Sequence, residues 1–295
     1  MYLQKPYGQA PYKALITEAA GLLVEICERE REASLEARLL LEHVCGTALS
    51  TMLLEPDRIV SANEVEKYHE LILRRYGREP LAYIVGAADF MGLTFGVSSD
   101  VLIPEQDTEN LVEEIMKETT GGERILDLCT GSGCILLSLL HYSSGSTGVG
   151  TDISEKALRV ARDNAERLGL THRAEWRQGD LFGALKEGES FDLIVSNPPY
   201  IQSSVIPGLA PEVKDHEPLL SLDGGEDGLD FYRRIIPGAL EHLERGGMLF
   251  LEIGYDQAEA VALLMRESGY YDVRVMKDYG GNDRVVRGLR SFTDR

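Results

Sequence analysis

Apolar residues in the first eighty positions of the chain recur every three or four residues, the spacing of helices that bury one side. One set is Leu15, Ile16, Ala19, Leu22, Leu23 and Ile26, and another is Val65, Tyr68, Ile72 and Tyr76. Between them, "SLEARLLLEHVCG" reads as a helix with Ser34 as N-cap and Gly46 as stop, and "STMLLE" reads as a shorter one. The pattern predicts a helical domain of four or five helices over residues 1–79.

The pattern changes at Pro80. The stretch "LAYIVGAADFMGLTFGVSSDVLIP" is rich in aromatic and β-branched residues and is interrupted by glycines. This composition is typical of strands joined by tight turns. We therefore expect a β-hairpin linker between two domains over residues 80–104.

From residue 105 to residue 295, short apolar runs alternate with helical patterns, which predicts an α/β domain with a doubly wound, mainly parallel sheet. Seven runs read as strands: "RILDL" (124–128), "TGVGTD" (147–152), "AEWRQG" (174–179), "FDLIV" (191–195), "GMLFLEI" (247–253), "DVRVMKD" (272–278) and "RVVRGLR" (284–290). Only "YGGN" joins the last two, which is too short for a crossover helix. That pair should be antiparallel, so the seven-stranded sheet is mixed.

Composition and charge narrow the class of protein. At 43% hydrophobic residues the 295-residue chain should fold, and no apolar run approaches the roughly 18 to 20 residues that span a bilayer, so we expect a cytoplasmic monomer with no membrane partner. The net charge of −19 argues against a stable complex with duplex nucleic acid. Cys27, Cys45, Cys129 and Cys134 lack metal-ligand spacing and should be free thiols, so no metal site is expected.

Three motifs follow successive predicted strands, where ligands of α/β sheets bind. The first strand ends in "DLCTGSGC", in which Leu136 stands where a dinucleotide fingerprint needs a third glycine. Asp152 ends the second strand, where a carboxylate can hold both ribose hydroxyls, and "GDLF" follows the third. The alternative is that the glycines only make a turn and that Asp152 only caps a helix.

Taken in order, the three motifs favour a site for an adenosine with a tail that carries no phosphate, and S-adenosylmethionine fits such a site. The expected cofactor-binding residues are Asp127, Cys129, Thr130, Gly131, Ser132, Gly133, Asp152, Ile153, Asp180, Leu181 and Asn197.

The fourth strand runs into "SNPPY", residues 196–200. Pro198 and Pro199 have fixed φ and no amide hydrogen. The carbonyls of this loop therefore form a rigid array of acceptors without local donors, which could bind an external NH2 group. The Asn197 side-chain oxygen and the Pro198 carbonyl could each accept one hydrogen from a planar amide or amino nitrogen, and Tyr200 could lie flat against that group. The alternative is a rigid loop that only ends the strand.

With these motifs the chain resembles the HemK/PrmC family of N5-glutamine methyltransferases. The resemblance extends over nearly the whole length and includes "FMGLTFGVSSDVLIP", "DTENLVE", "DLCTGSG", "SNPPYI", "LDGGEDGLDFYRRI", "LEIGYDQ" and "DYGGNDRVVRG". It implies a class I S-adenosylmethionine-dependent methyltransferase fold behind an N-terminal substrate-recognition domain. It also implies methyl transfer to the glutamine of the GGQ loop in class I peptide-chain release factors, with S-adenosylhomocysteine as product.

The resemblance gives roles to single residues. In the family the glycine-rich turn, the acid after the second strand and the asparagine contact the cofactor, and the Asn-Pro-Pro-Tyr loop also binds the glutamine amide. These roles fall on Cys129 to Gly133, on Asp152, and on the expected catalytic residues Asn197, Pro198, Pro199 and Tyr200.

Three positions depart from the family pattern. Pro104, Glu105 and Gln106 stand where Pro-Arg-Pro is usual, Leu181 replaces a bulkier aromatic of some members, and Cys129 stands where glycine is more common. Cys129 fits if its φ is negative. Thr108 and Glu109 match the family, either as a helix cap or as functional residues.

Three other functions remain open from the sequence. The same fold could methylate a glutamine of a ribosomal protein, and the helical domain would then select that partner. An adenine amino group satisfies the same two acceptors, but a nucleic-acid adenine-N6 methyltransferase needs basic grooves and a base-flipping surface. A cofactor-binding docking protein for translation factors would bind the cofactor and transfer nothing.

Overall fold

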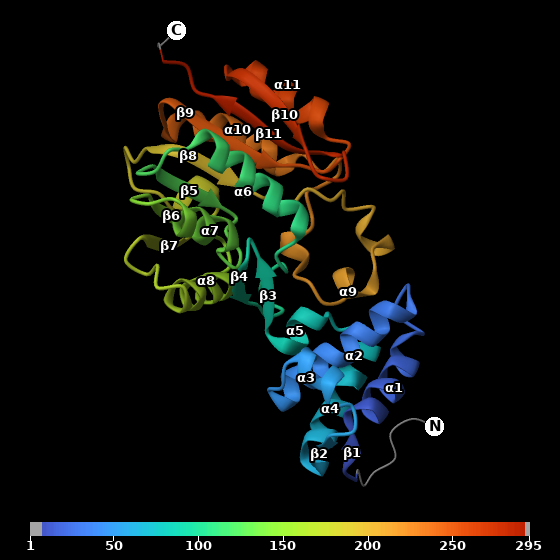
Figure 1. The fold of residues 1–295 in the computed structure, drawn as a ribbon. Helices are drawn as coiled ribbons and strands as arrows, with labels where there is room; N and C mark the ends of the chain where they lie inside the picture. The colour runs from blue at the N-terminus through green and yellow to red at the C-terminus, as the bar shows by residue number, and fades with distance from the viewer. Residues whose placement is uncertain (1–7, 293–295) are drawn as a thin grey trace. The chain divides into compact units, whose positions relative to one another are not determined.

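The computed structural model describes residues 8–292, which divide into two compact units (Figure 1). The first contains the described residues up to Gly86 together with Pro211–His216, and the second contains Ala87–Ala210 and the chain from Glu217 onward. The first division lies seven residues beyond the end expected for the helical domain. The short return of the chain at Pro211–His216 had no counterpart in the sequence pattern.

The first unit is built from helices. It contains α1 (Tyr12–Leu23), α2 (Glu30–Cys45), α3 (Leu49–Leu54), α4 (Ala62–Tyr76), α5 (Leu81–Val85), the short α9 (Pro211–Lys214), and a two-residue pair of strands, β1 (Ala10–Pro11) and β2 (Ile59–Val60). Except for Tyr76, which is 37% exposed, the residues of the predicted apolar faces meet in one core. Tyr68 is fully buried in it and donates its hydroxyl proton to the Ala37 carbonyl at 2.9 Å. Four of these helices, α1 to α4, lie before residue 80, which agrees with the prediction of four or five.

Local signals set some ends of these helices. Ser61 and Glu64 form a capping box at the start of α4, and Gly46 ends α2 in the left-handed conformation at φ +59°. The predicted N-cap at Ser34 is wrong, because α2 already begins at Glu30 and Ser34 lies inside it. The apolar face of α2 begins at Ala33, so its exposed first turn carries no hydrophobic signal.

A buried ion pair holds the returning segment in the first unit. The Arg75 side chain is 7% exposed and donates to Glu36 at 2.8 Å and to Glu212 at 3.1 Å. Arg78 also donates to Glu212 at 3.1 Å. Two carboxylates therefore compensate the buried guanidinium, and one of them comes from residue 212.

The predicted hairpin is shorter than expected. Its strands are β3 (Ala87–Phe90) and β4 (Leu93–Gly96), which pair antiparallel. The segment Leu81–Val85, expected to be a strand, is helix α5 instead. Its Ile84 is 5% exposed in the core of the helical unit, and Gly86 ends the helix at φ +71°. Burial against helices therefore overrides the β propensity of this run.

The second unit contains the predicted seven-stranded mixed sheet, in the order β10-β11-β9-β8-β5-β6-β7. Its strands are β5 (Arg124–Leu128), β6 (Thr147–Asp152), β7 (Ala174–Gln178), β8 (Phe191–Ser196), β9 (Leu243–Glu252), β10 (Tyr271–Lys277) and β11 (Asp283–Leu289). Strands β5 to β9 are parallel, and β11 is antiparallel to both β9 and β10. The strand order reverses between β5 and β8, which is where ligands bind in such sheets.

Helices cover both faces of this sheet. They are α6 (Gln106–Glu118), α7 (Cys134–Tyr142), α8 (Glu155–Arg167), α10 (Asp230–His242) and α11 (Ala258–Ser268), and short 3-10 turns lie at Leu181–Ala184, Ile206–Gly208 and Leu219–Ser221. Alternate residues of each central strand enter different cores. Leu249 and Leu251 pack with α10 and α11, whereas Phe250 packs with α6 and α7. This period of two confirms the doubly wound α/β fold.

Candidate active site

A cavity of about 230 Å³ opens at the carboxyl ends of the central strands, beside the point where the strand order reverses. Most of the residues that the sequence singled out line it: Cys129, Gly131, Asp152, Ile153, Asp180, Leu181, Asn197 and Pro199. They come from the loops after four strands, β5, β6, β7 and β8. The fold thus gathers residues that are up to seventy positions apart.

Four of the expected cofactor residues lie behind the glycine-rich turn and do not line the cavity. Asp127 is fully buried and accepts the Thr130 hydroxyl at 2.5 Å, and burial raises the pKa of Asp127 to about 7. Ser132 accepts the Asn164 amide at 2.9 Å through its carbonyl. A side chain on Gly133 would lie 2.8 Å from Trp176, and its φ is +78°. These residues hold the backbone of the glycine-rich turn in place without lining the cavity.

The expectation of a negative φ at Cys129 is wrong, because its φ is +57°. The left-handed conformation costs a residue with a side chain roughly 1 to 2 kcal/mol. Leu181, which also lines the cavity, has φ +51°. Two of the lining residues therefore hold strained backbone, a feature that is common where a site is shaped for a ligand.

Asp152 ties two walls of the cavity together. Its Oδ2 accepts the Gly131 amide at 3.0 Å, and its Oδ1 accepts the Ser154 amide at 2.9 Å. Burial raises the pKa of Asp152, and these backbone hydrogen bonds oppose that effect. Ser154, whose hydroxyl accepts the Ala157 amide at 3.2 Å, is the N-cap of α8. The alternative, that Asp152 only caps this helix, is therefore wrong, because the cap is Ser154.

The third wall combines an apolar residue with an exposed ion pair. Leu181 is 6% exposed, whereas the Asp180 side chain is 54% exposed and accepts from Arg234 of α10 at 2.6 Å. Arg234 lines the cavity, as do Phe231, the segment Asp100–Leu102 and the residues Pro218, Leu220 and Ser221. The sequence analysis assigned none of these to the site.

The Asn197–Tyr200 loop borders the same cavity. Pro198 is buried, and neither its carbonyl nor that of Asn197 accepts a hydrogen bond from any of residues 8–292. The Tyr200 carbonyl differs, because the Gln257 side-chain amide donates to it at 2.9 Å. Among residues 8–292, the expected array of free carbonyls therefore comprises Asn197, Pro198 and Pro199 and stops before Tyr200.

Side chains from α6 and β9 support this loop from below. The Asn197 Nδ2 donates to the Thr108 hydroxyl at 3.2 Å, and the Tyr200 hydroxyl donates to Glu252 Oε1 at 3.3 Å. Glu252 is 1% exposed, and burial raises its pKa to about 7 although hydrogen bonds from Thr108 and Tyr200 lower it. Thr108 and Glu109 do not cap α6, since Glu109 accepts the Met91 amide of the hairpin at 2.5 Å.

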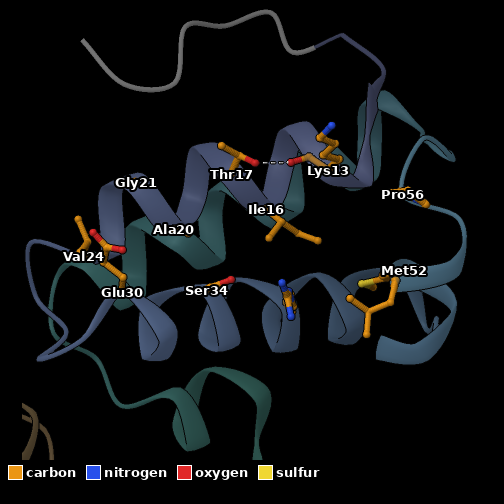
Figure 2. A pocket seen from close by; sticks show the side chains of 12 residues that line it. Lys13, Ile16, Thr17, Ala20, Gly21, Val24, Glu30, Ser34, Met52 and Pro56 are labelled. Carbon is orange, nitrogen blue, oxygen red and sulfur yellow. Dashed lines mark hydrogen bonds between the residues drawn. The ribbon is translucent and has the colours of Figure 1, made fainter.

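The helical unit has a cavity of its own, of about 440 Å³, between α1, α2 and α3 (Figure 2). Ile16, Ala20, Met52 and Leu53 give it an apolar lining, and Lys13 and Arg38 add two cations. Neither cation has an ion-pair partner among residues 8–292.

Metal and membrane sites are not evident in the described part of the chain. No three His, Cys, Asp or Glu side chains among residues 8–292 come together as a metal site. Within the same residues, none of the helices combines the length and the apolar character that crossing a bilayer requires.

Comparison with known proteins identifies the family. Residues 15–86 match the PrmC N-terminal domain, and residues 119–250 match a methyltransferase domain. A release factor glutamine methyltransferase of Caulobacter vibrioides is 42% identical over 262 residues, covering 88% of this chain and 90% of that protein. A second release factor glutamine methyltransferase, of Bradyrhizobium diazoefficiens, is 43% identical over 285 residues, covering 95% of this chain and 94% of that protein. The chain belongs to the release factor glutamine methyltransferase family. A solved methyltransferase of Pyrococcus furiosus, 19% identical, shares the fold with TM-score 0.52 over 76% of this chain and 98% of that one.

Family membership accounts for the motifs that the sequence analysis left without a role. The stretch "LEIGYDQ" supplies Glu252 and Gln257, which hold the Asn197–Tyr200 loop, and "LDFYRR" supplies Phe231 and Arg234 to the cavity. Glu105, which stands where the family usually has arginine, is the exposed N-cap residue of α6 and makes no side-chain capping bond.

Proposed function

We propose that this protein transfers a methyl group from S-adenosylmethionine to the side-chain amide nitrogen of the glutamine in the GGQ motif of class I peptide-chain release factors. The observation that carries the proposal is the Asn197 side chain in the cavity lining, followed directly by the Pro198 carbonyl, which accepts no hydrogen bond from residues 8–292. The names of the relatives, release factor glutamine methyltransferases, support the same substrate.

The residues of the cavity fit the cofactor. Asp152 presents a carboxylate whose two oxygens each accept one backbone hydrogen bond, which leaves lone pairs for a ribose diol. Leu181 offers an apolar surface for the base, and the strained turn at Cys129 brings backbone close to the ligand. S-adenosylmethionine, when bound, supplies an electrophilic methyl group whose bond to sulfur breaks as a nitrogen lone pair forms the new bond to carbon.

The loop prepares a weak nucleophile. An amide nitrogen is unreactive because its lone pair is delocalised into the carbonyl. Asn197 and Pro198 each accept one of its hydrogens, which raises the electron density on nitrogen and fixes its direction of approach. Fixed orientation can contribute roughly 7 to 11 kcal/mol in ideal cases. No strong base is needed before transfer, since the proton leaves after nitrogen has gained the methyl group.

We further propose that the helical unit binds the release factor in the cavity between α1, α2 and α3. The chain carries a net charge of −19, yet Lys13 and Arg38 line this cavity without an ion-pair partner among residues 8–292, where Glu30 is the one acidic lining residue. The expected occupant is a part of the factor that presents carboxylates beside apolar side chains. We propose that the enzyme acts in the cytoplasm with the translation machinery, and that it acts as a monomer.

The test is transfer of labelled methyl from S-adenosylmethionine to purified release factor from the same source. Three further substrates accompany it: the factor with its GGQ glutamine changed to alanine, a duplex DNA, and purified ribosomal proteins. We expect label on the unchanged factor alone. Label on DNA would move the assignment to an adenine methyltransferase, label on a ribosomal protein to another glutamine, and cofactor binding without transfer to a docking protein.

A further inference from the structure

Asn164 of α8 connects two segments that are distant from it in the chain. The residue is only 1% exposed, and α8 lies beside β4 (Figure 1). The Asn164 Oδ1 accepts the Gly96 amide at 2.7 Å, and its Nδ2 donates to the Gly96 carbonyl at 3.0 Å and to the Ser132 carbonyl at 2.9 Å. Both hydrogens of the side-chain amide are therefore used, and a flipped amide would set its oxygen against two carbonyls.

The first connected segment is the glycine-rich turn. Ser132 is buried between Gly131, which lines the cavity, and Gly133, the N-cap residue of α7. Among residues 8–292 the Ser132 carbonyl accepts a hydrogen bond from Asn164 alone. A buried carbonyl without a partner costs free energy, so the turn is most stable where it reaches Asn164. Asn164 thereby sets the position of the turn directly behind the part that borders the ligand.

The second connected segment leads into another wall of the cavity. Gly96 is the last residue of β4, and four positions later the segment Asp100–Leu102 lines the cavity. A tight turn joins them, in which the Ser98 carbonyl accepts the Val101 amide at 3.1 Å. The two hydrogen bonds between Gly96 and Asn164 therefore hold the start of this wall.

Gly96 permits this close approach because it has no side chain. A Cβ atom there would lie 3.1 Å from Asn164 Oδ1 and would clash with the guanidinium of Arg167, one turn further along α8. A side chain at position 96 would have to displace Arg167 and crowd Asn164. The contact between β4 and α8 thus depends on both members, the glycine and the asparagine.

We propose that Asn164 is a positioning residue for the cofactor, which holds the glycine-rich turn and the segment Asp100–Leu102 at the separation that S-adenosylmethionine requires. Asn164 does not itself line the cavity, so it acts through these two walls. The inference rests on the cofactor of the proposed function and not on the methyl acceptor. Loss of the Asn164 hydrogen bonds should therefore weaken cofactor binding in a protein that is still folded.

The experiment measures the Kd of S-adenosylmethionine by isothermal titration calorimetry for Asn164→Asp and Asn164→Leu in the full chain. Aspartate keeps an acceptor for the Gly96 amide but has at most one proton for the two carbonyls, and leucine has a similar shape without any hydrogen-bonding group. We expect the Kd to rise at least about tenfold in Asn164→Asp, the equivalent of roughly one net hydrogen bond. Asn164→Leu should raise the Kd further.

The matched control is Tyr270→Phe. Tyr270 is also buried in the second unit and donates to the Ile236 carbonyl at 2.8 Å, and neither residue lines the cavity. The change removes one buried hydrogen bond to a carbonyl, so it should lower the midpoint of urea unfolding. We expect the cofactor Kd of this variant to stay within about twofold of wild type, because the change is independent of the cavity.

The outcomes separate positioning from a general loss of stability. A Kd within about twofold of wild type in either Asn164 variant, once circular dichroism shows that variant to be folded, would overturn the inference. An equal rise in Tyr270→Phe would overturn it as well. If neither Asn164 variant folds, Gly96→Ala takes their place, because it disturbs the same contact from β4. Its Kd should rise, and an unchanged Kd overturns the inference. Wild-type protein that binds the cofactor but labels no release factor would refute the proposed function and leave the inference standing.

Discussion

Replacing Asp152 by asparagine should weaken S-adenosylmethionine binding about a hundredfold. One carboxylate oxygen becomes an NH2 group, which cannot accept a ribose hydroxyl as the carboxylate oxygen does, and that lost bond costs roughly 2 kcal/mol. The remaining oxygen loses its charge, and its hydrogen bonds weaken by roughly 1 kcal/mol. Together these effects come to about 3 kcal/mol, or about two decades in Kd. Isothermal titration calorimetry measures the change directly.

The matched control is Asp180→Asn, which removes the same charge from the same cavity. Its side chain is 54% exposed and pairs with an Arg234 side chain that is 50% exposed, and such surface pairs contribute about 0 to 1 kcal/mol. We expect its Kd within about fivefold of wild type. A cofactor analogue without the ribose hydroxyls should not distinguish wild type from Asp152→Asn. Equal Kd values for the two variants, or a hundredfold loss that persists with the analogue, would refute the assignment of Asp152 to the ribose.

Four further changes test other parts of the structure. Asn197→Ala should abolish methyl transfer while the cofactor Kd stays within roughly tenfold, and wild-type turnover would contradict the role of the loop. Cys129→Gly should stabilise the fold by about 1 kcal/mol in thermal unfolding, because glycine adopts φ +57° without strain, whereas a lower midpoint would contradict this. Burial raises the Glu217 pKa to about 7, so its contribution to stability is complete below about pH 4.5 and is lost as pH rises through 7. Between pH 5 and pH 8, the free energy of unfolding in urea should therefore fall by about 2 kcal/mol more for wild type than for Glu217→Gln. Parallel pH profiles of the two proteins would contradict the raised pKa of Glu217. Lys13→Glu with Arg38→Glu should raise the KM for release factor at least about tenfold with kcat unchanged. The control is the double change Arg31→Glu with Lys67→Glu, which lies outside the cavity. An equal rise in KM in the two double variants would refute the proposed docking site.

Patterns with a short period were predictable from the sequence. The strands of the sheet lie within a few residues of their expected positions because each is a buried run bounded by turn residues. The site residues that follow directly after those strands were also predictable, since the carboxyl ends of parallel strands meet in space. Asp152 and Asn197 are examples, and both line the cavity.

Contacts between distant segments were not predictable in the same way. Nothing in the neighbourhood of Thr108 indicates a partner at Asn197, eighty-nine residues away, and Glu252 reads locally as the end of a strand. The helix at Leu81–Val85 was missed because five residues are too few to show a helical period. The sign of a positive φ at Cys129 was that the family more often has glycine there, and this sign was not used, because a side chain in the left-handed conformation is stabilised only by its surroundings.

The segment Pro211–His216 makes the helical unit discontinuous along the gene. Exchanging the first 86 codons between relatives would bring in a new residue 75 but leave the resident residue 212 behind. A buried arginine that loses a carboxylate partner can cost about 3 to 5 kcal/mol, a large share of the stability of a domain. Recombination at the hairpin should therefore be disfavoured unless both positions are inherited together. The helical units of such proteins should diverge in step with a loop encoded more than a hundred codons downstream.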